Sequence, residues 1–219
     1  MLPASREDDP VSELRVDHVI YAVDDLETAG TRFYEEFGLG SVEGGRHPGW
    51  GTANRIVPLG DAYLELVTVV DSDEAASSAF GRAVSEAIAT REQLVGWAVA
   101  TEDLETVARR LRLEIVRGSR TRPDGTTLGW QLAGVDRSLA TGALPIFIAW
   151  GGPDELHPGR AEAHHRLAPT GFAWVAVAAD AQSLRSWLGD FEFELRIVDG
   201  APGLSAVAIS TDAGELVFR

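Results

Sequence analysis

The sequence predicts an α+β fold built from repeated strand–helix–strand–strand–strand (βαβββ) units. One pattern occurs three times: an apolar run, then an acidic residue, then an amphipathic segment. The tetrapeptide DLET stands at 25–28 and again at 103–106, 78 residues later, and Asp180 takes the equivalent place after a further 77 residues. Short runs with strand character, separated by Gly, Pro and Asp, follow each copy. The regular spacing therefore indicates three related units.

The first unit is expected over residues 16–71, after a solvated tail over residues 1–15. Val16–Val23 is an apolar, β-branched run and predicts a strand. Asp25 is a suitable N-cap for a helix whose apolar residues recur at helical spacing. The remaining strands of this unit are predicted around Val42, at 55–59 and at 63–70.

The rest of the chain follows the same plan. A polar, Ala-rich stretch predicts a linking helix over 72–93, and a loop rich in Gly, Pro and His occupies 152–170. The second unit is predicted over 94–151 and the third, more divergent unit over 171–219. Their later strands are expected at 114–117, 127–133 and 145–150, and at 193–198, 204–210 and 215–218.

Composition limits the partners. The chain has 219 residues with 19 basic and 34 acidic side chains, which gives a formal net charge of −15. Such a charge repels phosphate groups, so nucleic acid and anionic membrane are not expected as partners. The absence of cysteine excludes disulfides and thiolate metal ligands. No apolar run approaches the roughly 18 residues of a membrane span, and the N-terminus lacks a signal-peptide core, so we expect a cytoplasmic protein.

Repeated βαβββ units of this size resemble the vicinal oxygen chelate superfamily. Within it, DHVIYAV at 17–23 and GGRHPGWGTANRIVPLGDAYLEL at 44–66 are similar to the bacterial glyoxalase-like domain family. The resemblance is strongest over 16–71 and weakens toward the C-terminus. It implies that units pair into half-barrel sheets around a cavity that holds a small-molecule ligand.

The resemblance also implies a divalent metal (Zn, Ni, Mn or Fe), held by a His on the first strand and a Glu on the last strand of each unit. His18 and Glu65 match in the first unit. In the second unit Gly96 stands opposite His18, and the last strand lacks a carboxylate. In the third unit only Glu215 is a candidate, after a one-residue shift in the alignment. A histidine of the 152–170 loop, His157, His164 or His165, is the other candidate to complete the site.

Candidate substrate-binding residues lie in the glycine-rich segment 44–54. Its glycines allow backbone and polar groups to approach a ligand closely. The segment lacks the features of a phosphate-binding loop. The candidates are Arg46, His47, Trp50, Thr52 and Asn54, together with Trp97 from the second unit.

Two functions remain open from the sequence. One is a metal-dependent lyase, isomerase or dioxygenase that acts on vicinal oxygen atoms, with His18 and Glu65 as ligands. The other is a metal-free protein that binds or sequesters a small molecule, as resistance proteins of the superfamily do. Because three units cannot all pair within one chain, we also expect a homodimer in which the remaining units pair.

Overall fold

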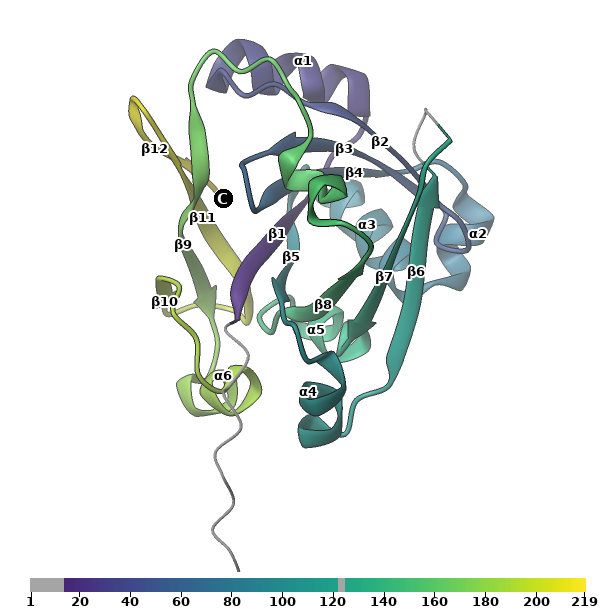
Figure 1. Cartoon of the computed structure of the whole chain (residues 1–219), viewed down its shortest axis with the longest axis vertical. Coiled ribbons are helices and arrows are strands. Elements are labelled where there is room, and N and C mark those ends of the chain that lie inside the picture. The colour runs from purple at the N-terminus through teal and green to yellow at the C-terminus, as the bar shows by residue number, and fades with distance from the viewer. Residues whose placement is uncertain (1–13, 122–124) are drawn as a thin grey trace, which may run out of the picture.

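The computed structural model describes residues 14–121 and 125–219, and this part of the chain forms two β-sheets. Eight strands close into a barrel in the order β1-β4-β3-β2-β6-β7-β8-β5. Four further strands form a second sheet in the order β10-β9-β11-β12, which stands beside the barrel (Figure 1). Because the eight-stranded sheet closes on itself, it has no free edges. The mixed α+β fold that the sequence predicts is confirmed.

The first half of the barrel has the predicted order of elements. Asp25 caps α1 by accepting a hydrogen bond from the Thr28 amide at 2.8 Å, and the helix ends at Gly38, which has a φ of 69°. Strand β1 runs parallel to β4, so His18 lies opposite Tyr63. The elements are β1 (Arg15–Ala22), α1 (Leu26–Phe37), β2 (Val42–His47), β3 (Thr52–Pro58) and β4 (Tyr63–Val69).

The second half repeats this topology. Asp103 caps α4 through the Thr106 amide, as Asp25 does in the first copy of DLET. Strand β5 runs parallel to β8, and its antiparallel pairing with β1 closes the barrel. The short helix α5 has no counterpart in the first half and was not predicted. The elements are β5 (Gln93–Ala100), α4 (Leu104–Leu111), β6 (Ile115–Thr121), β7 (Thr127–Ala133), α5 (Val135–Thr141) and β8 (Ile146–Gly151).

Two helices link the halves where the sequence predicted one. They are α2 (Ser72–Ser77) and α3 (Ala79–Thr90), and the chain turns between them at Ser78, whose hydroxyl caps α3. Phe80 and Val84 of α3 pack against residues that face the barrel interior, including Ile20. Helix α3 therefore packs beside β1, β4 and β5, and its Phe80 side chain reaches the cavity.

The third unit has the predicted order of elements but a different sheet. In each half of the barrel the first strand pairs with the last, whereas β9 lies between β10 and β11. The third unit is therefore not a βαβββ module of the same topology. Its elements are β9 (Pro169–Ala178), α6 (Ala181–Leu188), β10 (Leu195–Ile197), β11 (Gly203–Thr211) and β12 (Gly214–Phe218).

The second sheet packs one face against the outside of the barrel. Val175 and Val207 belong to the same buried cluster as Val19 and Trp97 of the barrel. The Phe218 ring stacks on Phe33 of α1 with a centroid separation of 5.5 Å. The two halves of the barrel pair with each other. The third unit is covered on this face by the barrel of the same chain. The homodimer stays a prediction.

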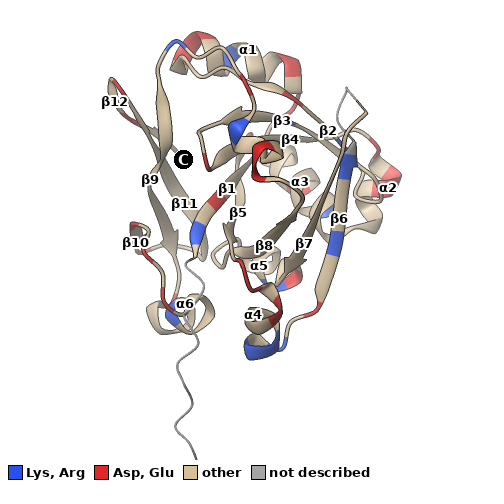
Figure 2. Ribbon diagram, in the orientation of Figure 1, with Lys and Arg blue, Asp and Glu red and all other residues tan. Residues whose placement is uncertain are grey.

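Charge and surface features follow the composition. Figure 2 shows acidic positions spread over α1, α2, α4 and the connecting loops.

The loop between β8 and β9 contains two short 3-10 turns, η1 (Asp154–Leu156) and η2 (Pro158–Arg160). Among residues 14–121 and 125–219, no helix is both long and apolar enough to cross a membrane.

Candidate functional site

A cavity lies inside the barrel and takes residues from both halves. Its free space is about 40 Å3, which is room for a few water molecules. The first half and α3 contribute His18, Ile20, His47, Trp50, Asn54, Tyr63, Glu65 and Phe80. The second half contributes Arg120, Trp130, Leu132, Val135, Ile146, Ile148 and Trp150. Aromatic rings therefore fill most of the interior, and a few polar groups project among them.

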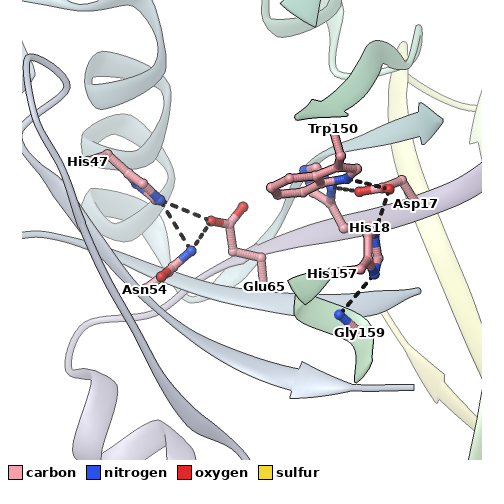
Figure 3. Close-up of polar contacts among 8 residues, drawn as sticks. All are labelled: Asp17, His18, His47, Asn54, Glu65, Trp150, His157 and Gly159. Atoms are coloured by element: carbon pink, nitrogen blue, oxygen red, sulfur yellow. Dashed lines mark hydrogen bonds and ion pairs between the residues drawn. The ribbon is translucent and has the colours of Figure 1, made fainter. Parts of the chain in front are cut away.

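His18 and Asp17 form a hydrogen-bonded pair at one side of this cavity (Figure 3). Nδ1 of His18 lies 2.6 Å from Oδ1 of Asp17, and the imidazole stacks on the Tyr63 ring at 4.7 Å. The β1–β5 register shifts between Val16 and His18, an irregularity at the point where the two neighbouring side chains meet. Within the described part of the chain, Nε2 of His18 has no hydrogen-bond partner, and His18 lines the cavity.

Asp17 is completely buried and accepts hydrogen bonds from three side chains. Its Oδ2 lies 2.9 Å from Nε1 of Trp150 and 3.0 Å from Nε2 of His157. The Gly159 amide donates to Nδ1 of His157, so Nε2 of that ring carries the proton that Asp17 accepts. Burial raises the pKa of Asp17, but the hydrogen bonds from His157 and His18 outweigh it and hold the pKa well below its usual range. Asp17 is therefore a fixed anion, and His18 donates Nδ1–H to it.

Glu65 is the centre of a second polar group. Its Oε1 accepts a hydrogen bond from Nδ2 of Asn54 at 2.5 Å and lies 3.6 Å from Nε2 of His47. Oδ1 of Asn54 in turn accepts a hydrogen bond from Arg120 at 3.1 Å. Figure 3 shows the Glu65 carboxylate between His47 and Asn54 on one side and the Asp17, His18 and Trp150 group on the other.

The His47 ring is held in one orientation. Nδ1 lies 2.9 Å from the Thr52 hydroxyl, while Nε2 faces Nδ2 of Asn54 at 3.2 Å, which favours the tautomer with the proton on Nδ1. Burial lowers the pKa of His47, and the nearby Glu65 only partly opposes this. His47 is consequently a neutral group at physiological pH.

Gly44 allows the Asn54–Arg120 contact. A Cβ atom at this position would lie 1.9 Å from Oδ1 of Asn54 and 2.3 Å from a guanidinium nitrogen of Arg120. Such distances do not occur between non-bonded atoms, so a side chain here would displace both polar groups. The expected role of glycine in this segment, close approach to other groups, applies at this position.

The structure brings five of the predicted site residues together: His18, His47, Trp50, Asn54 and Glu65 all line the cavity. The other predicted substrate-binding residues lie elsewhere. Arg46 is exposed, because it precedes His47 on β2 and alternate side chains point to opposite faces. Thr52 is buried behind His47. Trp97 is in the core outside the cavity, where its Nε1 donates to the Ala143 carbonyl.

None of the candidates for a third metal ligand lines the cavity with His18 and Glu65, although His157 contacts Asp17 beside His18. Glu215 is exposed on β12 and accepts a hydrogen bond from Trp174. His164 is exposed beside Tyr34 and lines a groove outside the barrel. The described residues contain no group of three or more His, Asp or Glu side chains arranged to hold a metal ion.

The second half of the barrel does not supply the ligand pair that the resemblance implies. Ile20 lies opposite Glu65, and its counterpart Ala98 lies opposite Ile146, so Ile146 takes the position of Glu65. Gly96 takes the position of His18. The residues present therefore do not fit the four-ligand set of the superfamily, although His18 and Glu65 share one cavity.

Sequence reasoning missed several cavity residues. Tyr63, two residues before Glu65, is one of them. Asp17 was missed as the partner of His18, although an Asp next to a His is a signal for a carboxylate–imidazole pair. Trp130 and Trp150 lie in predicted strands, but the sequence does not show which face of the strand they take. Arg120 had no sequence signal, because only the pairing of β6 with β7 and β2 shows that it points inward.

The paired βαβββ halves around an enclosed cavity define the vicinal oxygen chelate fold. A family model described as a glyoxalase-like domain matches residues 16–191, which is more than half of the chain. The chain therefore belongs to the glyoxalase-like domain family.

One solved structure agrees on the fold over most of the chain. A hypothetical protein from Staphylococcus aureus is 17% identical, with 94% of this chain and 99% of that chain covered and a TM-score of 0.67. Methylmalonyl-CoA epimerase from Mycobacterium tuberculosis is 19% identical over 68% of this chain and 94% of that chain, with a TM-score of 0.45. No curated protein matches the chain in sequence. At these identities the likeness concerns the fold, not the activity.

Proposed function

We propose that this protein binds a small oxygen-containing molecule inside the barrel and transfers a proton from it to Nε2 of His18. The observation that carries the proposal is the Asp17–His18 pair. The buried carboxylate accepts Nδ1–H, which leaves Nε2 as the basic atom at the cavity. A carboxylate in this position orients an imidazole and stabilises the imidazolium that forms when Nε2 takes a proton.

The other polar groups supply binding and orientation. Arg120 is suited to a carboxylate or carbonyl oxygen of the ligand, because its guanidinium carries several N–H donors at the cavity wall. Glu65 adds a second carboxylate, which can accept a proton or a hydroxyl hydrogen bond. The apolar wall excludes water and strengthens these interactions. This arrangement suits removal of a proton from carbon next to a carbonyl, as in an isomerase or lyase.

A divalent ion held by His18 and Glu65 is the second candidate. It is favoured by the Asp17–His18 hydrogen bond, because metal-binding histidines usually donate their other ring N–H to a carboxylate or carbonyl. Such a site has only two protein ligands here, so the bound molecule or water would complete it. Zn, Ni, Mn or Fe would accept this mixture of nitrogen and oxygen ligands.

A hydrogen-exchange assay in D2O tests the proposal. A panel of small 2-oxo acids and hydroxyketones is incubated with the protein, and NMR follows the loss of the C–H signal next to the carbonyl. His18→Gln should slow the exchange by about 10²–10⁴-fold, the usual contribution of a general base. His164→Gln is the matched control, because that ring is exposed outside the cavity.

Three outcomes separate the candidates. Exchange that is equal in the wild type and His18→Gln contradicts proton transfer at His18. About one equivalent of metal that disappears in His18→Gln supports the metal site. Ligand binding without exchange or metal, detected by tryptophan fluorescence, favours the sequestering function that the sequence left open.

A further inference from the structure

A groove on the outside of the barrel adjoins the interior cavity. It lies between the start of α3, the turn after α4 and the start of α5, and its apolar lining includes Trp50, Phe80, Leu113, Val116 and Val135. Three of these residues, Trp50, Phe80 and Val135, also line the interior cavity. The two spaces are thus separated by a wall one side chain thick. The groove has about 290 Å3 of free space, against about 40 Å3 inside the barrel.

Trp50 is the part of this wall whose side chain carries a polar atom that is not held by a hydrogen bond among the described residues. Its indole packs against Phe80 at 5.4 Å and against Trp130 at 6.2 Å, and among the described residues its Nε1 has no hydrogen-bond partner. Gly49 and Gly51 flank it with φ values of 80° and 68°, in a turn between β2 and β3. A rotation of the Trp50 side chain therefore breaks no hydrogen bond.

Trp150 provides the contrast. It separates the same cavity from a smaller pocket of about 70 Å3, and its Nε1 is tied to Asp17 at 2.9 Å. Moving Trp150 would remove a donor from a buried carboxylate, which is costly. Of these two walls, entry past Trp50 costs less.

The lining of the groove indicates what it would hold. Val116 is 40% exposed, which leaves an apolar side chain open to solvent next to the half-buried Leu113. The charged side chains around it are of both signs: Arg112, Glu114, Asp136 and Arg137. Their formal charges balance, so the groove offers apolar contact rather than a site for an ion.

We infer that the groove binds the apolar tail of the ligand, an alkyl or aryl chain whose oxygen-containing head passes Trp50 into the barrel. This inference rests on the proposed function for the position of the head. Each methylene group that the groove buries contributes about 0.8 kcal/mol. That value corresponds to roughly fourfold tighter binding per CH2.

Two titrations test the groove. The first uses straight-chain alcohols from 1-butanol to 1-octanol, followed by the indole N–H signals of ¹⁵N-labelled protein, with the Trp50 signal assigned by a Trp50→Phe variant. Affinity should rise by roughly fourfold per CH2, and the Trp50 signal should shift. Val116→Asp should weaken octanol binding by at least tenfold. Val217→Asp, at an exposed valine of β12, is the matched control and should have no effect.

The second titration uses 2-oxo acids from 2-oxobutanoate to 2-oxooctanoate in the exchange assay. The rate at low concentration should rise with chain length in the wild type and not in Val116→Asp. Affinity that does not depend on chain length, or a Val116→Asp variant that behaves like Val217→Asp, overturns the inference. Octanol binding at Trp50 that persists in His18→Gln, with no exchange in any protein, would support the groove and contradict the proposed chemistry.

Discussion

The two halves of the barrel have the same topology but line the cavity with different chemistry. The first half supplies His18, His47, Asn54 and Glu65, whereas the second supplies Trp130, Trp150, two isoleucines and one buried charge, Arg120. At equivalent positions in the strand register, the first half has Glu65 and the second half has Ile146. One half therefore holds the reactive groups, and the other forms the apolar wall that isolates them from water.

This difference indicates how a repeated fold can hold a specific site. The topology needs only the alternation of inward and outward side chains, which both halves keep. The inward positions of one half are then free to change from ligand or base to aliphatic residue.

Asp17→Asn should have the largest effect. Asparagine cannot accept three hydrogen bonds at the same atoms, so at least one buried donor among Trp150, His157 and His18 loses its partner. We expect a loss of about 3 kcal/mol in unfolding free energy, measured by urea denaturation. In the exchange assay kcat should fall by at least about tenfold with little change in KM, because Asp17 acts through His18 and does not contact the ligand.

The stabilisation from Asp17 also depends on pH. Its pKa is lower in the folded protein than in the unfolded chain, so the unfolded state binds more protons as the pH falls below about 4. The stabilisation is therefore present above that pH and is lost toward acid. Asp17→Asn should lack this acid-dependent component. Asp61→Asn, at an exposed carboxylate that pairs with Arg160, is the control.

Gly44→Ala tests whether the polar half of the barrel needs a glycine at this position. A methyl group at Gly44 meets Asn54 and Arg120, whereas a methyl group at Gly96 of the second half has only Ile20 nearby, at 4.0 Å. Gly44→Ala should destabilise the protein by about 1–3 kcal/mol through overpacking, seen as a lower Tm. Gly96→Ala should be close to neutral. Equal effects would show that the Asn54–Arg120 contact does not constrain the polar half.

The smallest effect is expected for His47. Because burial lowers its pKa in the folded state, the unfolded chain binds more protons just below pH 6.5. The stability of the wild type should therefore fall between pH 7 and pH 5.5, by at most about 1.4 kcal/mol per pH unit for one proton. His47→Gln should have a flatter profile in thermal unfolding over this range. A profile identical to that of the wild type would show that His47 is not neutral and buried in solution.

The repeat in the sequence predicted the order of elements in both halves of the barrel, and the family resemblance implied that such units pair around a cavity. DLET marks the N-cap of both α1 and α4, and the strands around it follow within a few residues of the predicted bounds. His18 and Glu65 were expected to share a cavity because of the family resemblance, and both side chains line the cavity. The same local patterns could not predict that β9 lies in the middle of its sheet, because strand order depends on contacts between distant segments.

The candidate site was predicted in part for the same reason. Arg46 and His47 are adjacent, and only the register of β2 shows that His47 points inward and Arg46 outward. Trp97 was expected to bind substrate, but its side chain packs into the core between the barrel and the second sheet. Two of the three partners of Asp17, Trp150 and His157, come from more than 130 residues away in the chain, where no local signal exists.

The position of the second sheet has a consequence for strand β1. Its inward side chains, His18 and Ile20, belong to the cavity, while Val19 is buried on the other side in the cluster shared with β9 and β11. Asp17 is buried as well. Every side chain from Asp17 to Ile20 is thus buried. A shift of one residue in register would move the cavity side chains into the core and the core side chains into the cavity. The C-terminal sheet therefore helps to fix the register of β1 from outside the barrel, and the proposed chemistry depends on that strand.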